Sequence, residues 1–318
     1  MSGIVRWIVI TVGLALAAAA SAQSQRPVRV LVPSPPGGPS DVQIRLVQQR
    51  MTEALGQTLL VDNRASNNGV LSAELGAQAA PDGHTLTVGN SGTHAVNATL
   101  YKVLPYDPVR DFAPITLFST TGMVLAANPK VPGTKLQDLV EHAKKQPGKT
   151  HVAIAGATGQ LAGDALWPRL QVQMNNVPYK GSAPSEMAVL AGETQLSMLT
   201  PLATAKHIEA GRMKAYGITS LQRHPLLPNV PTFAEQGVSG YSVEYWNGLF
   251  APAKTPKRTV QALHKAAVYA LRAPEVKERF EALGFVIVGN TPEEFAQVVK
   301  TDVEKFRKTI VESGMPRL

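Results

Sequence analysis

The sequence predicts an α/β protein with two lobes, each a mostly parallel β-sheet covered by helices. Short β-branched segments alternate with longer amphipathic segments in the first third of the chain, which is typical of β-loop-α units. The same alternation restarts after residue 135. The length of 318 residues also exceeds the roughly 100–200 residues of a typical single domain.

The elements of the first lobe follow from apolar periodicity and turn residues. Gly56 is placed to end the first long helix, and Pro81-Asp82-Gly83 forms a turn signal after the second. The predicted elements are a strand at 28–32, a helix at 41–55, a strand at 58–62, a helix at 71–80 and a strand at 85–88.

The second lobe and the C-terminal region follow the same patterns. The expected elements are a helix at 136–145, a strand at 151–155, a loop at 156–159, a helix at 160–170, a strand at 177–179, a helix at 185–190, a strand at 195–199, a helix at 201–210 and a strand at 214–218. The remaining elements are helices at 255–272 and 274–283, a strand at 285–288 and a helix at 292–313. The last helix starts with a polar cap, a proline and two acids, and it is long enough to cross back over the first lobe.

Residues 1–22 have the pattern of a cleaved signal peptide. Arg6 is their one charge, an apolar stretch follows it, and Ala20-Ser21-Ala22 offers the small residues that a signal peptidase reads. The alternative is a membrane anchor, but the apolar stretch is shorter than the roughly 20 residues that a bilayer core needs. We therefore expect cleavage after Ala22, export to the periplasm and a soluble mature protein.

Composition argues against several functional classes. The chain has no cysteine, so disulfides, thiol catalysis and cysteine-based zinc sites are excluded. None of the seven histidines forms a metal-binding pair, and no nucleotide-binding or nucleophile-elbow motif occurs, so we expect no metal, no cofactor and no catalysis. Ser91 and His94 could suggest a nucleophile and a base, but residues three apart on a turn are more often local hydrogen-bond partners. The 31 basic and 23 acidic residues are scattered, which argues against nucleic acid.

Three loops rich in small residues follow predicted strands and are candidates for ligand contact. Glycines let backbone N–H groups approach a ligand, and a helix start adds unpaired donors and a positive dipole end, so such loops favour an anion. Ligands of open α/β sheets lie beyond the carboxyl ends of the strands. The alternative for the first loop is an ordinary turn with Ser40 as the helix N-cap. The candidates are Pro36, Gly37, Gly38, Ser40 and Asp41, then Ser91, Gly92 and Thr93, and then Ala157, Thr158 and Gly159.

A series of short motifs runs in order along the whole mature chain. They are RPVRVLVP (26–33), GGPSD (37–41), VDNR (61–64), APDGHTL (80–86), SGTHA (91–95), LPYDP (104–108), DFAP (111–114), VPYKGSAP (177–184), LPNVPT (227–232) and GLFAP (248–252). Together these motifs resemble one known family, the Bug receptors, also called the TctC family, which are the solute receptors of tripartite tricarboxylate transporters. One second-lobe segment departs from the family, since IAGATGQL at 154–161 lacks the histidine of the usual S-x-G-x-G-T-x-x-H-L pattern.

The resemblance implies a type II periplasmic-binding-protein fold, an α/β architecture of two lobes with mixed β-sheets flanked by helices. It places a hinge of two crossing strands near 123–128 and 243–251. Residues 23–124 with 248–318 would form lobe 1, and residues 125–247 would form lobe 2. In this family carboxylates are held largely by backbone amides, small hydroxyls and ordered waters. The resemblance therefore supports the three loops and adds Tyr179, Gly181, Ser182 and Ala183 to the predicted ligand-binding set.

The sequence therefore predicts a periplasmic solute-binding receptor that captures a small organic carboxylate in the cleft between its lobes. Its expected partners are the membrane permease subunits of a tripartite tricarboxylate transporter, and a monomer is expected. One alternative is a sensing receptor that docks on a two-component signalling system. Another is an enzyme, which would convert its ligand rather than only bind it.

Overall fold

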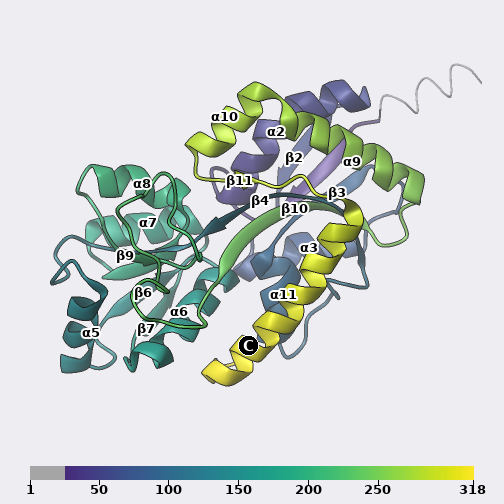
Figure 1. Cartoon of the computed structure of the whole chain (residues 1–318). Helices are drawn as coiled ribbons and strands as arrows, with labels where there is room; N and C mark the ends of the chain where they lie inside the picture. Colours follow the sequence, from purple (N-terminus) through teal and green to yellow (C-terminus); the bar gives the residue numbers. More distant parts are fainter. Residues whose placement is uncertain (1–25) are drawn as a thin grey trace, which may run out of the picture.

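The structure is a computed structural model that describes residues 26–318. Two β-sheets, each flanked by helices, form two lobes that lie side by side (Figure 1). Lobe 1 is here the part built around the six-stranded sheet, and lobe 2 is the part built around the five-stranded sheet. The predicted two-lobed α/β fold is confirmed. The predicted signal peptide, residues 1–22, lies outside the described residues.

The sheet of lobe 1 is mixed, with the strand order β11-β4-β10-β3-β1-β2. Strand β1 pairs in parallel with β2 and β3, whereas β10 runs antiparallel to β3 and β4. The mostly parallel sheet expected from periodicity alone was therefore wrong, because β4 and β10 connect the lobes directly instead of closing β-α-β units. The strands are β1 (Val28–Val32), β2 (Leu59–Asn63), β3 (Thr85–Asn90), β4 (Phe112–Gly122), β10 (Glu244–Pro252) and β11 (Val286–Ile287).

Helices cover both faces of this sheet because its strands alternate between two apolar cores. In β4, Ile115 and Phe118 face the core under α2, α9 and α10, while Phe112 and Leu117 belong to the core under α3 and α11. The helices and helical turns are α2 (Pro39–Leu55), η1 (Asn67–Gly69), α3 (Val70–Ala77), η2 (Gly92–Val96), α4 (Asn97–Leu100), α9 (Lys257–Arg272), α10 (Pro274–Ala282) and α11 (Pro292–Ser313).

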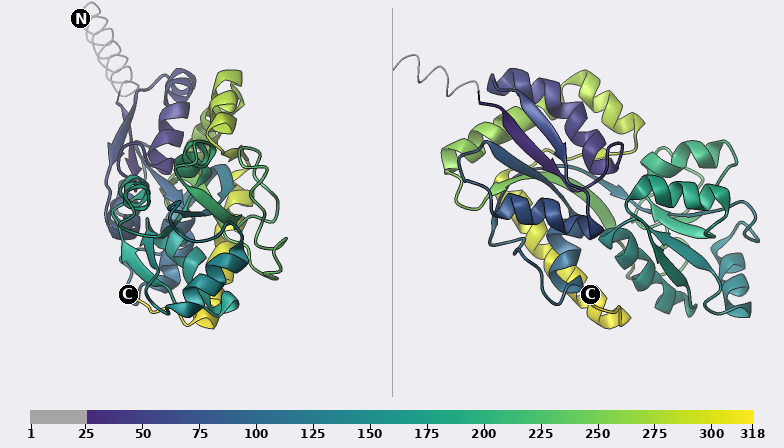
Figure 2. Two further views of the ribbon diagram at one scale, coloured as in Figure 1. Left: turned by 90° about the vertical axis from the view of Figure 1, so that its left-hand side faces the viewer. Right: turned by 180° about the vertical axis from the view of Figure 1, so that it is seen from behind.

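The C-terminal helix α11 crosses lobe 1 as predicted, and it is seen from behind in Figure 2. Its capping box forms as the sequence indicates, with Thr291 and Glu294 each bonding the other's backbone. Phe295 packs edge-on against Trp246 at 5.5 Å and lies 4.8 Å from the ring of Phe250. A side chain at Gly248 would come within 2.2 Å of Phe295, so the glycine permits this close packing.

Lobe 2 has the strand order β7-β6-β8-β5-β9, in which β6 is parallel to β7 and β8 and β5 is antiparallel to β8 and β9. Among residues 26–318, none of the helices combines the length and the apolar composition that a membrane span requires. The strands are β5 (Val124–Ala127), β6 (His151–Ile154), β7 (Asn175–Pro178), β8 (Leu196–Leu199) and β9 (Lys214–Ile218). The helices are α5 (Leu136–Lys145), α6 (Ala157–Leu170), α7 (Ser182–Ala191) and α8 (Pro201–Glu209).

Two strands carry the chain between the lobes, as predicted. The chain passes from β4 to β5 through Met123 and returns into β10 just after Val243. Thr219, at the end of β9, ties both crossings together. Its hydroxyl accepts the Met123 N–H at 2.8 Å and donates to the Val243 carbonyl. The proposed lobe boundaries at residues 124 and 247 stay predictions.

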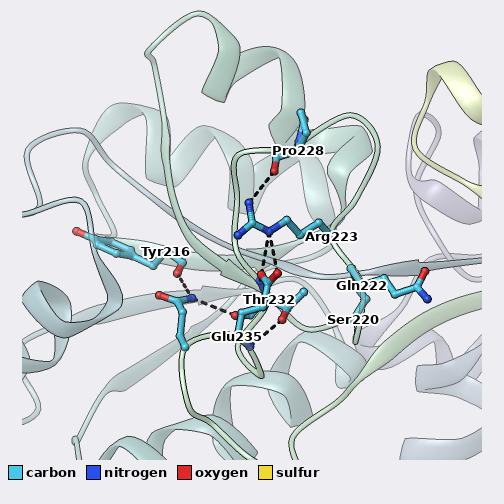
Figure 3. A network of polar contacts seen from close by, with 8 residues as sticks. Tyr216, Ser220, Gln222, Arg223, Pro228, Thr232 and Glu235 are labelled. Carbon is cyan, nitrogen blue, oxygen red and sulfur yellow. Dashed lines mark hydrogen bonds and ion pairs between the residues drawn. The ribbon is translucent and has the colours of Figure 1, made fainter.

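The segment between β9 and β10, residues 219–243, contains none of the named helices or strands and is held by side chains (Figure 3). Arg223 pairs with Glu235 at 2.9 Å and donates to the carbonyl of Pro228 at 3.1 Å. Glu235 in turn accepts the Thr232 N–H at 2.8 Å. These bonds let a long connection lead into the second crossing without a sheet or helix of its own.

Candidate functional site

A cavity of about 420 Å³ lies between the two lobes. Its volume falls within the roughly 300–1,000 Å³ of small-molecule sites. Lobe 1 contributes residues that follow β1 and β3, together with residues 65–69. Lobe 2 contributes residues that follow β6, β7 and β8. These parallel strands thus end at the cavity, the position that the sheet topology favours for a ligand.

Two helices of lobe 2 begin at the cavity wall. The helix α6 starts at Ala157 after Gly156, and α7 starts at Ser182 after Gly181. The two glycines have φ of 150° and 108°, which other residues rarely adopt, and neither helix has a side-chain cap. The first N–H groups of a helix have no intrahelical partner and carry the positive end of its dipole. Both helix starts therefore favour a negative group in the cavity.

The predicted loop at 156–159 is largely the first turn of α6, because Ala157, Thr158 and Gly159 are already helical. Ser182 and Ala183 likewise belong to the first turn of α7. The sequence pattern missed these starts because they contain small residues and no apolar period. The correction strengthens the electrostatic argument, since a helix start holds more aligned N–H groups than a free loop.

The lobes touch each other at the cavity. Ser91 of lobe 1 and Thr158 of lobe 2 share a hydrogen bond of 2.9 Å between their hydroxyl oxygens. A side chain at Gly92 would lie 3.1 Å from the same Thr158 hydroxyl, and one at Gly181 would lie 3.1 Å from Pro35. Small residues at these positions therefore allow the lobes to meet around the space that they enclose.

A buried polar network holds Thr93 at the lobe 1 wall. Its N–H donates to the Asn90 side chain at 3.0 Å, and its hydroxyl accepts the Asn90 N–H at 2.9 Å. His94 Nδ1 lies 2.8 Å from the same hydroxyl, and its ring stacks on Phe250 at 4.0 Å. Burial lowers the pKa of His94 to about 3, so this imidazole is neutral at physiological pH.

The charge on the cavity wall comes from Lys180. Of the described residues that line it, Lys180 is the one with a charged side chain, and it is exposed. Among residues 26–318, Lys180 makes no ion pair that would neutralise its charge, and no acid lines the wall. A single cation together with two helix N-termini makes the site suited to an anion.

The predicted residues divide between the cavity wall and its surroundings. Gly92, Thr93, Ala157, Thr158, Gly159, Tyr179, Gly181 and Ser182 line the cavity. Pro36, Gly37, Gly38, Ser40, Asp41, Ser91 and Ala183 do not.

Most residues of the first glycine loop, 36–41, do not line the cavity but make contacts that support its wall. Helix α2 starts at Pro39, so Gly38 is its N-cap and the Ser40 alternative does not apply. Ser40 instead donates to Asn247 at 2.6 Å. Asp41 is buried and accepts the Gly37 N–H at 2.9 Å and the Arg45 guanidinium at 2.8 Å. These bonds use the loop to anchor α2 rather than to line the cavity.

Sequence reasoning missed a second group of lining residues. Met123 and Tyr245 come from the two crossing segments, so only the three-dimensional topology brings them to the wall. Ser34 and Thr200 follow β1 and β8, and the rule of strand ends would have found them had it been applied to every strand. Pro39 and Lys180 also line the cavity and lie within the predicted segments 36–41 and 179–183. The residues missed are Pro33, Ser34, Pro35, Ala65, Ser66, Asn67, Asn68, Gly69, Asn90, Met123, Ala155, Gly156, Met198, Leu199, Thr200 and Tyr245.

The cavity is suited to binding a small molecule. Ser91 and His94 do not form the pair of nucleophile and base that their spacing could suggest. The Ser91 hydroxyl bonds Thr158, while His94 contacts Thr93 instead of Ser91. In the described part of the chain, no group of three or more His, Asp or Glu side chains is placed to hold a metal ion.

Comparison with known proteins gives consistent results. A family model described as "Tripartite tricarboxylate transporter family receptor" (TctC) matches residues 43–315. The periplasmic binding protein BugD is 33% identical, with a TM-score of 0.87 over 92% of this chain and 99% of that chain. MatC from Rhodopseudomonas palustris, solved with bound malate, is 32% identical, with a TM-score of 0.86 over 90% of this chain and 99% of that chain. Rpa4515 from R. palustris, solved with adipate, is 29% identical, with a TM-score of 0.88 over 92% and 99%.

Proposed function

Because the chain belongs to the tripartite tricarboxylate transporter receptor family (TctC) and is a non-enzymatic periplasmic solute-binding protein, we propose that it captures a small organic carboxylate in the cavity between its lobes. The observation that carries the proposal is the pair of uncapped helix starts at Ala157 and Ser182 on the wall of that cavity. The malate and adipate bound by the two R. palustris relatives support the same ligand class.

The physical basis is a set of donors without competing acids. Helix N–H groups can each donate to a carboxylate oxygen, and bonds of this kind to a charged group are stronger than neutral ones. Lys180 adds a screened attraction at the exposed side of the wall. Contact between Ser91 and Thr158 across the cavity is the type of interaction that would hold the lobes together around a bound ligand.

The transport role follows from the family. We infer that the lobes close on the carboxylate and that the closed form delivers it to the permease subunits of a tripartite tricarboxylate transporter. The proposal includes cleavage of the signal peptide after Ala22, a periplasmic mature chain and a monomeric receptor with no nucleic-acid partner.

A charge-reversal pair on one helical turn tests the site. Ser182 lines the cavity at the start of α7, whereas its neighbour Ala183 is exposed and lies off the wall. An acid is favourable in the first turn of a helix, so both Ser182→Asp and Ala183→Asp should fold. Ser182→Asp should weaken carboxylate binding by about 100-fold or more, since like charges about 4 Å apart repel by about 4 kcal/mol at an effective dielectric constant of ~20.

Isothermal titration with malate, adipate and related C4–C8 dicarboxylates measures the difference. Ala183→Asp and the neutral Ser182→Asn should each bind within about fivefold of the wild type, because surface charge effects are worth about 1 kcal/mol or less. Equal affinity of Ser182→Asp and the wild type would refute the anion site. Failure of the wild type to bind any carboxylate would refute the ligand class.

A further inference from the structure

The two lobes also meet away from the cavity, at the turn between α10 and β11. Gly284 in this turn belongs to lobe 1, because its neighbour Phe285 is buried in the core around α2, α9 and α10. A side chain at Gly284 would lie 2.9 Å from Pro201 Cβ and 3.0 Å from the ring of His224. It would also lie 3.3 Å from Leu226 Cδ1. The glycine therefore fits into a notch formed by these three side chains.

The side chains of this notch belong to lobe 2, and Figure 1 shows α8 and α10 at neighbouring edges of the two lobes. Pro201 is the first residue of α8. His224 and Leu226 closely precede Leu227, which is buried in the apolar cluster of β5, β6 and β9. Leu202, next to Pro201, packs against the core of lobe 1. The contact at Gly284 is therefore part of an apolar junction between the lobes.

A hydrogen bond from His224 crosses between the lobes at the same point. The Leu226 N–H donates to His224 Nδ1 at 3.2 Å, so the ring hydrogen is on Nε2. His224 Nε2 then donates to the Gly284 carbonyl at 3.1 Å. Burial lowers the pKa of His224, which favours the neutral ring that these two bonds require. Separation of the lobes at this point would leave the carbonyl without this partner.

We propose that Pro201, His224, Leu226 and Gly284, here called the inter-lobe latch, are positioning residues that favour the arrangement in which the lobes enclose the cavity. The latch occurs in the same arrangement as the hydroxyl contact across the cavity. None of its four residues lines the cavity, so it changes ligand affinity only through the position of the lobes. This inference goes beyond the proposed capture of a carboxylate and concerns the equilibrium between lobe positions that precedes it.

The latch predicts a particular pattern of affinities. The apparent affinity of a two-state receptor is its intrinsic affinity multiplied by the fraction of free protein that is already in the binding-competent state. All groups of the latch belong to the chain, so it contributes with and without a ligand. The free protein should therefore populate the closed arrangement in part, and loss of the latch should weaken every ligand by the same factor.

Two variants disrupt the latch, and one matched glycine serves as the control. Gly284→Ala places a methyl group against Pro201 and His224. His224→Phe keeps a ring in the notch and removes the bond to Gly284, so it serves as the second test if Gly284→Ala folds poorly. Gly289→Ala is the control, because Gly284 and Gly289 both have a left-handed φ, of 80° and 65°. A side chain at Gly289 would have Leu271 Cδ1 of lobe 1 as its nearest contact, at 3.7 Å.

Double electron–electron resonance measures the distance between the lobes in each protein, with and without ligand. The chain has no cysteine, so Leu71→Cys and Met187→Cys introduce two unique labelling sites. Both side chains are exposed, and they belong to α3 of lobe 1 and α7 of lobe 2. The ligand is the C4–C8 dicarboxylate that binds the wild type most tightly, and isothermal titration gives the affinities for the series.

The free wild type and free Gly289→Ala should each show a share of about a tenth or more at the distance found in the ligand-bound wild type. In free Gly284→Ala and free His224→Phe this share should fall below detection. Both latch variants should bind all dicarboxylates of the series more weakly by one common factor of about fivefold or more. Gly289→Ala should bind within about twofold of the wild type, because it touches neither lobe 2 nor the cavity.

The inference would be overturned if both latch variants matched Gly289→Ala in free-state distances and in affinity, or if the free wild type had no share at the liganded distance. Weaker binding without a change in the free-state distances would overturn it too, and so would losses that differ between ligands by more than about threefold. These results leave carboxylate capture by the wild type intact. A wild type that binds no dicarboxylate would refute the proposed function alone, and the free-state distances of the variants and the control would still decide on the latch.

Discussion

His94 is fully buried, and its surroundings contribute to how the stability of the fold responds to acid. Its ring stacks on Phe250 at 4.0 Å and meets the edge of Phe112 at 4.4 Å. Burial lowers its pKa from 6.5 to about 3, so the folded protein keeps this imidazole neutral down to that pH. The unfolded chain takes up a proton below about pH 6.5. The stability due to the neutral imidazole is thus complete above pH 6.5 and is lost as the pH falls from 6.5 towards 3.

Urea unfolding at pH 7.5, 6.5, 5.8 and 5.0 checks this behaviour. The free energy of unfolding should fall below pH 6.5, and His94 alone should contribute up to about 1.4 kcal/mol per pH unit. His94→Gln should lower stability at every pH, because it removes the aromatic contacts, but its loss per pH unit should be smaller. His224, whose pKa burial also lowers, titrates in both proteins and serves as the common background. Parallel curves for the two proteins would show that His94 is protonated in the fold.

At the scale of elements, Thr219 joins strand β9 to both of the segments that cross between the lobes. The Met123 N–H donates to its hydroxyl, which in turn donates to the Val243 carbonyl, and both of these residues are buried. Gly122 lies next to this point, and a side chain there would come within 2.6 Å of Ser220. The two crossings are therefore tied to each other at this point through one hydroxyl group.

We expect Thr219→Val to lower the free energy of unfolding by about 1–3 kcal/mol, because it leaves the Met123 N–H and the Val243 carbonyl without their partner. Thr219→Ser keeps the hydroxyl and should recover most of the loss. Thr301→Val, on the exposed side of α11, is the matched control and should change stability by less than about 0.5 kcal/mol. Chemical denaturation measures all three, and a Thr219→Val variant as stable as the control would rule out this role.

The ends of the helices show which boundaries can be predicted from the sequence and which cannot. Strong apolar periodicity placed the helix at 136–145 correctly, and it also found both ends of α11 from its cap and its final apolar residues. The starts of α6 and α7 were placed too late, at 160 and 185 instead of Ala157 and Ser182. Their first turns consist of small residues after a glycine, a composition shared by loops and helix starts. The same ambiguity applies to the start of α2, where the sequence offered Ser40 as an N-cap candidate and the structure has Gly38 as the N-cap.

On the scale of the whole molecule, the alternation of strands and helices and the family resemblance predicted the two-lobed fold. Only part of the candidate site could be predicted from the sequence. Gly92, Thr158 and Gly181 could be proposed because they follow strands locally, whereas Tyr245 reaches the cavity only because β10 crosses back between the lobes.

The central claim is that the space between the lobes holds an organic acid against the starts of α6 and α7. Native mass spectrometry of the protein isolated from cells, followed by identification of the released small molecule, tests it most directly. We predict a one-to-one adduct with a carboxylate in the wild type and in Ala183→Asp, and its absence in Ser182→Asp. A released cation or a neutral compound, or a carboxylate retained equally by Ser182→Asp, would contradict the account.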